Sequence, residues 1–378
     1  MVIMCCSCGR CPAQLRRSHL PAHRSAVCRS CFIGALESEV HEFIVKKGLF
    51  ERGDVIAVGV SGGKDSAVLL HLLYELNRRH DYGIELVMVA VDEGIVGYRD
   101  HSLDAVDEQQ RRYGLPLRVL SYDELYAGWT MDRVVGAVGK RGNCTYCGVF
   151  RRQALERGAG MCSATKLATG HNADDVAETV LMNLLRGDLA RLQRCVKPLG
   201  RGGPDENVPR VKPLFRCYEK EIVLYARFLG LTYFATECLY APNAYRGHVR
   251  TLIKQFERIR PRSILDILAS GTRLARMAAS VGGKSMDSSK LASLNIARSK
   301  SICVRCGSIS SRQLCHACAL LDQLDEFRSR PRRHLSLKNA EDERRQEQDE
   351  VTAIEDLVMS DGQRGRTGCA CSNANEVL

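Results

Sequence analysis

The chain of 378 residues is long enough for roughly two to three domains, and 45% of its residues are hydrophobic, which excludes a globally disordered protein. It contains neither the roughly 18 consecutive apolar residues of a membrane span nor a secretory signal after Met1, so we expect a cytoplasmic protein with no membrane partner. The net charge is +11, but residues 325–378 hold 9 basic and 12 acidic residues, which leaves +14 on the rest. This basic body favours a polyanionic partner, although an ordinary mixed surface fits the charge equally well.

Cysteine is abundant from the first residues onward. Eighteen cysteines in a chain without a secretory signal indicate metal or redox chemistry rather than disulfides. The first two CxxC pairs, with sixteen residues between them, are Cys8/Cys11 and Cys28/Cys31. This is the spacing of a zinc ribbon, so we predict a structural Zn²⁺ module over residues 1–33. Cys5 or Cys6 could replace one ligand, but the paired spacing favours Cys8 and Cys11.

Strand-like and helix-like segments alternate from residue 34 to residue 242. Short apolar runs predict strands at 54–60, 85–91, 116–120 and 166–169, and a further short strand ending near residue 214. Apolar residues at helical spacing predict helices at 67–76, 102–113, 174–186 and 219–229. This alternation predicts an α/β fold, a doubly wound parallel sheet with its ligand at the carboxyl ends of the strands.

The segment Ser61-Gly62-Gly63-Lys64-Asp65-Ser66 lies where the first strand passes into a helix. Its glycines let the backbone approach an oxyanion, and the helix N-terminus offers N–H groups and a positive dipole end. A Walker A loop would need glycine in place of Val58 and serine or threonine in place of Asp65. We therefore predict a different phosphate-binding loop, which holds ATP through residues 61–66.

Two further segments end strands at the same edge of the predicted sheet. Asp92 closes the second strand, and Gly170-His171-Asn172-Ala173-Asp174-Asp175 leads from the fourth strand into a helix. An acidic pair at a helix start is also an ordinary cap, but its place beside the phosphate loop favours Mg²⁺ or phosphate. We predict that Asp92, Gly170 and His171 line the nucleotide site and that Asp174 or Asp175 helps hold Mg²⁺.

A single CxxC pair, Cys144 and Cys147, lies between these segments and is followed by Arg151. Two thiolates cannot complete a zinc site. Either the pair is redox-active, or a distant cysteine completes a metal site. The internal candidates are Cys162, Cys195, Cys217 and Cys238.

Residues 243–300 form a basic segment of helical period. The residues Arg246, Arg250, Lys254 and Arg258 recur every four positions and share one helix face. Such a stripe favours salt-sensitive binding to nucleic-acid phosphates, with a merely solvated basic face as the alternative.

A second set of paired cysteines follows this segment. The pairs are Cys303/Cys306 and Cys315/Cys318, with eight residues between them. A closed set of four thiolates is structural, so we predict a second zinc module over residues 301–324. Residues 325–378 are charged and poor in apolar residues, which predicts a disordered acidic tail.

The motifs GVSGGKDS, VDEGI, CTYCGVFRR, GHNADD and YRGH, with the turn Thr236–Cys238, together resemble one family. It is the tRNA 2-thiolation ligase family of the PP-loop ATP pyrophosphatase superfamily, in particular its eukaryotic cytoplasmic branch. The resemblance covers about residues 5–322. It implies that ATP adenylates O2 of the wobble uridine, U34, and that sulfur then displaces AMP at C2.

The resemblance also implies roles for the middle cysteines. In that family, cysteines matching Cys144, Cys147 and Cys238 hold a [4Fe–4S] cluster, whose open iron can accept sulfide. A persulfide on the CxxC pair, without a cluster, is the alternative. Relatives often carry lysine where this chain has Arg151, and arginine stabilises phosphate but cannot shuttle a proton.

The implied partners are tRNA (the Lys, Glu and Gln acceptors), a ubiquitin-like sulfur carrier with a thiocarboxylate, and a homologous non-catalytic subunit. Cytidine 2-thiolation and lysidine synthesis are alternative activities, and lysidine synthesis would not need the CxxC pair. A non-catalytic zinc-ribbon RNA-binding scaffold is the third alternative, and the intact loop 61–66 speaks against it.

Overall fold

The computed structural model of the chain describes residues 2–140, 142–200, 208–236, 238–240, 245–281, 301–310 and 312–329. The predictions for residues 282–300 and for the tail from residue 330 onward lie outside these ranges. The chain separates into two units, Met1–Asp325 and Glu326–Leu378, and the elements below are those of the first. Within the described residues, no helix combines the length and apolar composition that crossing a membrane requires.

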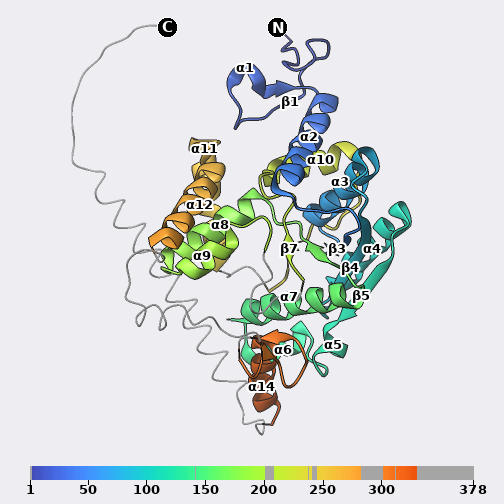
Figure 1. Ribbon diagram of the computed structural model, residues 1–378, viewed down its shortest axis with the longest axis vertical. Helices are drawn as coiled ribbons and strands as arrows, with labels where there is room; N and C mark the ends of the chain where they lie inside the picture. The colour runs from blue at the N-terminus through green and yellow to red at the C-terminus, as the bar shows by residue number, and fades with distance from the viewer. Residues whose placement is uncertain are drawn as a thin grey trace, which may run out of the picture. The chain divides into compact units, whose positions relative to one another are not determined.

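A five-stranded parallel sheet organises the first unit (Figure 1). Its strands are β3 (Val55–Val60), β4 (Glu85–Asp92), β5 (Leu117–Ser121), β6 (Lys166–Ala168) and β7 (Arg210–Val211). Their order is β5-β4-β3-β6-β7, and every neighbouring pair is parallel. The order reverses between β3 and β6, so the turns that follow these two strands open on one crevice. This confirms the predicted α/β fold.

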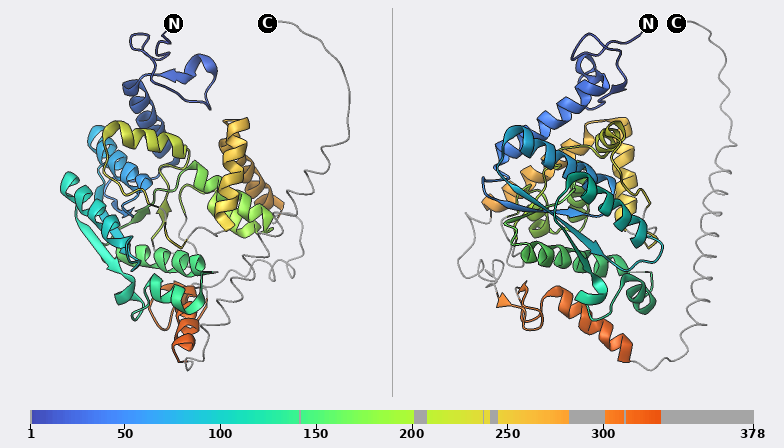
Figure 2. Two further views of the ribbon diagram at one scale, coloured as in Figure 1. Left: turned by 180° about the vertical axis from the view of Figure 1, so that it is seen from behind. Right: turned by 90° about the vertical axis from the view of Figure 1, so that its right-hand side faces the viewer.

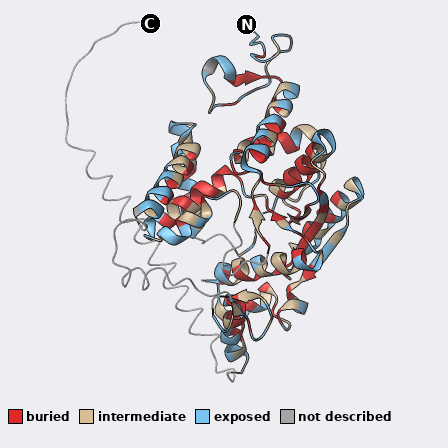
Figure 3. Cartoon of the chain, viewed as in Figure 1, coloured by how far each residue is buried: buried red, intermediate tan, exposed pale blue. Residues whose placement is uncertain are grey.

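Helices cover both faces of the sheet (Figure 2). On one face, Ile56 and Val58 pack into the core formed with α2 (Arg29–Lys47), α3 (Lys64–His80) and α10 (Glu219–Leu229). On the other face, Ala57 packs with Ala159 of α7 (Asn143–Met161), as the alternation of side chains along a strand requires. A Cβ at Gly158 would lie 2.6 Å from Leu120 and Val89, so α7 approaches the sheet closely. Buried residues gather along this sheet and on the inner sides of its helices (Figure 3).

The remaining helices of the domain form two groups. On the β5 side these are α4 (Arg99–Tyr113), α5 (Tyr122–Leu125) and α6 (Met131–Val138). A second group contains α8 (Ala173–Leu185), α9 (Leu189–Cys195), α11 (Tyr245–Ile259) and α12 (Ser263–Val281). The described part of the basic segment, residues 245–281, is thus two helices, because Pro261 follows the end of α11 and cannot continue it.

Two small cysteine modules flank the sheet domain in sequence. The N-terminal module contains β1 (Leu15–Arg16), α1 (Ala22–Ser25) and β2 (Ala26–Val27), with an antiparallel strand pair, and it leads directly into α2. The C-terminal module pairs β8 (Ser301–Ile302) with β9 (Ile309–Ser310) and continues into α14 (His316–Ser329).

Candidate nucleotide and sulfur-transfer site

The phosphate loop connects β3 to α3 and is closed by its own side chains. The Ser66 hydroxyl donates to the Gly63 carbonyl (2.9 Å) and accepts from the Ser61 amide (3.2 Å). Gly62 has φ +69°, and a Cβ there would lie 2.4 Å from the Ser102 carbonyl, so only glycine fits. The loop therefore leaves the start of α3 open to an anion, as predicted from its sequence.

The turn that follows β6 lies against this loop. A Cβ at Gly170 would come within 3.0 Å of the Asp65 backbone. The Asn172 amide donates to Asp65 Oδ1 (3.0 Å), and its carbonyl oxygen accepts from the Asp175 amide (3.0 Å) in a capping box. The two motifs, far apart in sequence, thus meet at one sheet edge, as the strand order requires.

Four carboxylates gather beside the loop. Asp174, Asp175 and Glu178 come from the first turns of α8, and Glu219 begins α10. The Asp174 side chain is only 4% exposed and that of Glu178 only 3%. The sequence analysis named the aspartates but missed both glutamates. Glu178 follows Asp174 by one helical turn and could have been found from that spacing, whereas Glu219 has no local signal.

Basic side chains neutralise this acidic group. Lys254 Nζ lies 2.6 Å from Asp174 and 3.1 Å from Glu219, and Lys64 Nζ lies 3.0 Å from Glu219. Arg246 pairs with Asp175 (2.8 Å) and also with Glu178, which Arg250 contacts at 2.9 Å. Burial raises the pKa of Asp174, and the hydrogen bond from Lys254 offsets part of that rise. Clustered carboxylate oxygens are hard ligands, so the site fits Mg²⁺ bound with ATP.

These ion pairs change the interpretation of the basic helix face. Arg246, Arg250 and Lys254 each form an ion pair with the acidic group, while Arg250 and Arg258 remain exposed. Three of the four cations are therefore paired within the chain, and binding of the stripe to nucleic acid stays a prediction. Helical spacing shows which residues share a face, but it does not show what the face opposes.

An open pocket lies beside the phosphate loop and the acidic group. Its lining includes Gly63, Lys64 and Asp65 of the loop, the four carboxylates, and the aromatic side chains of Tyr98 and Phe234. Asp92 and His171, predicted to bind nucleotide, do not line it. Asp92 accepts a hydrogen bond from the Gly94 amide (2.8 Å) and pairs with Arg99 (2.9 Å). It therefore stabilises the turn that follows β4. His171 Nδ1 lies 2.9 Å from the Thr169 hydroxyl.

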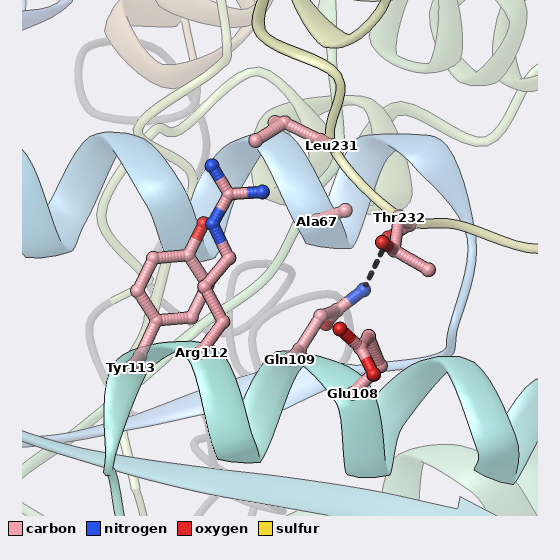
Figure 4. A pocket seen from close by; sticks show the side chains of 7 residues that line it. All are labelled: Ala67, Glu108, Gln109, Arg112, Tyr113, Leu231 and Thr232. Atoms are coloured by element: carbon pink, nitrogen blue, oxygen red, sulfur yellow. Dashed lines mark hydrogen bonds between the residues drawn. The ribbon is translucent and has the colours of Figure 1, made fainter.

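A second pocket is small and lies behind the loop, between α3, α4 and the segment that follows α10 (Figure 4). Gln109 crosses it, and its amide donates to the Thr232 carbonyl (3.1 Å). No residue predicted for the site lines this pocket. We therefore assign the nucleotide to the open pocket.

The middle cysteines lie at the start of α7. Cys144 and Cys147 occupy its first turns, and Arg151 follows one turn later. Arg151 Nη2 donates to Cys147 Sγ (3.4 Å), and its Nε lies 2.7 Å from Glu93, which the sequence analysis did not assign. The negative charge of Glu93 raises the pKa of Arg151, which therefore stays protonated.

Cys238 lies close to this pair. Burial and then the charge of Cys238 raise the pKa of Cys144, and for Cys147 burial is again the main cause, with Cys238 contributing. Among the described residues, these three sulfur atoms do not form a set within 4.8 Å of one another. A single ion would need a tighter set, whereas the thiolates of an iron–sulfur cluster bind different irons. The donor set therefore fits a cluster better than zinc.

Two closed cysteine sets fit zinc. In each set the four sulfur atoms lie within 4.8 Å of one another, and the sets are Cys303/Cys306/Cys315/Cys318 and Cys5/Cys8/Cys28/Cys31. The prediction of Cys11 as a ligand is therefore wrong. The Cys5 amide donates to the Cys11 carbonyl (2.8 Å), and this turn buries Cys5 and leaves Cys11 exposed. Both Cys5/Cys8 and Cys8/Cys11 satisfy CxxC spacing, so spacing alone could not choose.

The parallel sheet with its loop at the switch point defines a PP-loop protein of the ATP pyrophosphatase class. Residues 35–256 match the PP-loop domain family, and residues 301–331 match a zinc-ribbon family. Cytoplasmic tRNA 2-thiolation protein 1 of Drosophila ananassae is 49% identical over 365 residues, covering 96% of this chain and 100% of that one. The Drosophila melanogaster protein of that name is 51% identical over 326 residues, 86% and 89% of the two chains. The chain belongs to the cytoplasmic tRNA 2-thiolation protein 1 family.

A solved structure has a similar fold. It is the U34-tRNA thiolase NcsA from Methanococcus maripaludis with its [4Fe-4S] cluster, which is 28% identical to this chain. The two structures superpose with a TM-score of 0.69, over 86% of this chain and 97% of that one.

Proposed function

We propose that this chain is a cytoplasmic enzyme that thiolates C2 of the wobble uridine of tRNA at the expense of ATP. The observation that carries the proposal is the common sheet edge. Tyr98 lines the same pocket as the phosphate loop and the acidic group, and it packs against the same apolar cluster as Cys147 and Cys238. The names of the relatives at about 50% identity support the same substrate and compartment.

Adenylation is the first step. Oxide is a poor leaving group from C2 of uracil, so O2 attacks the α-phosphorus of ATP, and the bond to the β-phosphate breaks to release pyrophosphate. The loop residues 61–66 hold the phosphates, and Asp174, Asp175, Glu178 and Glu219 are the groups that hold Mg²⁺, which neutralises phosphate charge when bound. The ammonium groups of Lys64 and Lys254 lie beside the loop and stabilise the negative charge that develops on the phosphates in this step.

Sulfur transfer is the second step. Sulfide attacks C2, the bond from C2 to O2 breaks, and AMP departs with that oxygen. Cys144, Cys147 and Cys238 would hold a [4Fe–4S] cluster, and such a cluster would supply an open iron for sulfide. Arg151 lies between Cys147 and Glu93 and stays protonated, so it orients and neutralises negative groups but does not move a proton.

The proposed reaction involves a sulfur donor, a tRNA substrate and a partner subunit. Sulfur arrives on the thiocarboxylate of a ubiquitin-like carrier, the tRNAs are the Lys, Glu and Gln acceptors, and a homologous non-catalytic subunit assists. A cluster is favoured over a persulfide on the CxxC pair because a third thiol, Cys238, lies close to that pair.

The test uses the full chain, purified without oxygen and loaded with zinc and iron. It is incubated with ATP, sulfide and unmodified tRNA. The products are AMP and pyrophosphate, and thiolated tRNA is seen by its retardation in a mercury gel. Asp174→Asn is expected to abolish both products. Cys144→Ala is expected to abolish thiolation but to leave pyrophosphate formation, because adenylation precedes sulfur transfer, and Cys162→Ala is the matched control. Formation of ADP and phosphate, or normal thiolation in Cys144→Ala, would refute the proposal.

A further inference from the structure

The proposed reaction places a geometric condition on the uracil ring, and the inference below depends on that proposed function. O2 must meet the α-phosphate held by the phosphate loop, while sulfide delivered beside the cysteines of α7 must reach C2. O2 and C2 of the uracil ring are directly bonded to each other. The ring must therefore lie in the space between the loop and the cysteines.

Tyr98 belongs to the linings of both the nucleotide pocket and the cysteine region. It precedes α4 and lines the open pocket beside Gly63 and Lys64. With Cys147 and Cys238, it also packs against the apolar cluster that contains Ile95, Tyr122 and Phe150.

Phe234 extends this aromatic surface. Its ring meets Tyr98 edge to face, with centroids 5.4 Å apart and planes at 65°. On another side it stacks on His101 at 5.4 Å. Phe234 lines the same pocket and is only partly buried, in a segment that is neither helix nor strand. No apolar core explains its place, since it packs in neither of the clusters that flank the sheet.

The phosphate loop holds both aromatic residues. The Phe234 amide donates to the Gly62 carbonyl (2.7 Å). From the other direction, the Ser102 hydroxyl of α4 donates to the Ser61 carbonyl (3.0 Å), one turn after Tyr98. Two segments that are more than a hundred residues apart thus place their aromatic rings at a fixed position relative to the bound phosphates.

We propose that Tyr98 and Phe234 form the stacking platform for the wobble uracil. Proteins recognise single-stranded bases by stacking them on aromatic side chains, and loss of one such ring weakens binding by about tenfold or more. The platform covers one face of the base, and it leaves O2 free at the edge and C2 open to sulfide from the opposite face. Adenine of ATP has a similar π face, and the test must distinguish the two.

The test measures binding of an anticodon stem-loop RNA to the full, metal-loaded chain by fluorescence anisotropy. One RNA carries uridine at position 34, and a matched RNA is abasic there. The wild-type chain is expected to prefer the uridine RNA. Phe234→Ala is expected to reduce that preference about tenfold, while Phe234→Tyr and Tyr98→Phe, which keep the rings, retain it. Phe234→Leu keeps apolar bulk without a ring and is expected to lose the preference, which separates stacking from folding.

Binding of ATP and of inorganic tripolyphosphate is measured in parallel. Phe256→Ala, an aromatic deletion at a 42% exposed position of α11, is the control and is expected to change neither preference nor affinity. If Phe234→Ala weakens ATP but not tripolyphosphate and leaves the RNA preference intact, the platform binds adenine and the inference is overturned. It is also overturned if the wild type does not distinguish the two RNAs. If the wild type forms no AMP with tRNA, the proposed function itself fails, and this assay separates the two results.

Discussion

The two zinc modules are attached to the domain by different forces. In the N-terminal module, the Arg17 side chain is 2% exposed and pairs with Glu221 of α10 (2.7 Å) and Glu39 of α2 (2.6 Å). In the C-terminal module, Leu320, Leu321 and Leu324 share one apolar cluster with side chains of α6 and α7, and α14 lies beside α6 (Figure 1). The first attachment adds a buried ionic network to the apolar contacts of Val27 and Phe32, whereas the second consists mainly of apolar contacts.

Each module holds a different half of the site. The N-terminal module contacts α10 through the ion pair of Arg17 with Glu221, and α10 begins at Glu219 of the acidic group. The C-terminal module contacts α7. Gln153 of α7, about two turns after Cys147, donates a hydrogen bond to Cys315 Sγ (3.2 Å). Both modules are structural, yet the first supports the nucleotide side and the second supports the sulfur side. The following predictions test this division.

Removing a zinc ligand is expected to have the largest effect. Cys318→Ser opens the C-terminal set and removes binding energy on the order of 10 kcal/mol. The module then unfolds and bares the apolar side of α7, so the chain is expected to lose one zinc and its iron while ATP binding persists. Metal analysis and ATP titration measure this. Retention of iron at the wild-type level would show that α7 does not depend on the module.

The same measurement sharpens the N-terminal half of the comparison. Cys5→Ser is expected to remove one zinc and to spare the iron, whereas Cys11→Ser is expected to keep both zinc ions. The pair is a matched control, since both residues satisfy CxxC spacing with Cys8. Loss of zinc in Cys11→Ser with none in Cys5→Ser would reverse the assignment of the ligand.

The next largest effect is expected from the ionic network. Arg17→Met leaves the buried Glu221 without its partner, and breaking such a pair costs about 3–5 kcal/mol. Unfolding followed by circular dichroism in denaturant measures the loss. ATP affinity should fall with it, because α10 shifts, while iron content stays normal. The double variant Arg17→Met/Glu221→Leu removes both charges and should recover most of the stability. If it does not, the charge pair is not the cause.

A smaller effect is expected at the contact between α7 and the second zinc set. Gln153→Leu keeps the side-chain size but removes the N–H groups that point to Cys315 and Cys306. Loss of such an outer contact typically weakens metal affinity about 10- to 100-fold. Competition with a chelator should therefore release one zinc earlier than in the wild type and leave the other unchanged. Equal release of both ions would contradict the assignment.

The sequence predicted the strands and several helices because their apolar residues repeat with a clear period. It missed α7, whose buried side includes Ala154, Gly158 and Ala159, since small residues packed on a sheet leave little hydrophobic signal. It found the phosphate loop and Asp174, which belong to local motifs. Glu219 and the partners of the basic helix depend on which elements oppose each other in space. Local sequence does not contain that information.

The smallest expected effect is a pH dependence of the N-terminal attachment. His19 stacks on Tyr218 (4.6 Å) and lies 3.6 Å from Glu221. Burial lowers the pKa of His19, and Glu221 offsets this only in part. Below pH ~6.5, His19 binds a proton in the unfolded chain but stays neutral in the folded chain until the pH reaches its lower folded pKa. Stability is therefore complete above that pH and falls as the pH drops through the folded pKa, by at most about 1.4 kcal/mol per pH unit.

The variant His19→Phe keeps the stacked ring and removes the titration. Melting temperatures at pH 7.5 and pH 5.5 should therefore differ less in this variant than in the wild type. His248→Phe changes an exposed histidine of α11 and should behave as the wild type does. Because Glu221 and Arg17 are present in all three chains, their own contribution cancels in the comparison. An equal drop in His19→Phe and wild type would mean that the ionic network, and not the buried imidazole, makes this module sensitive to acid.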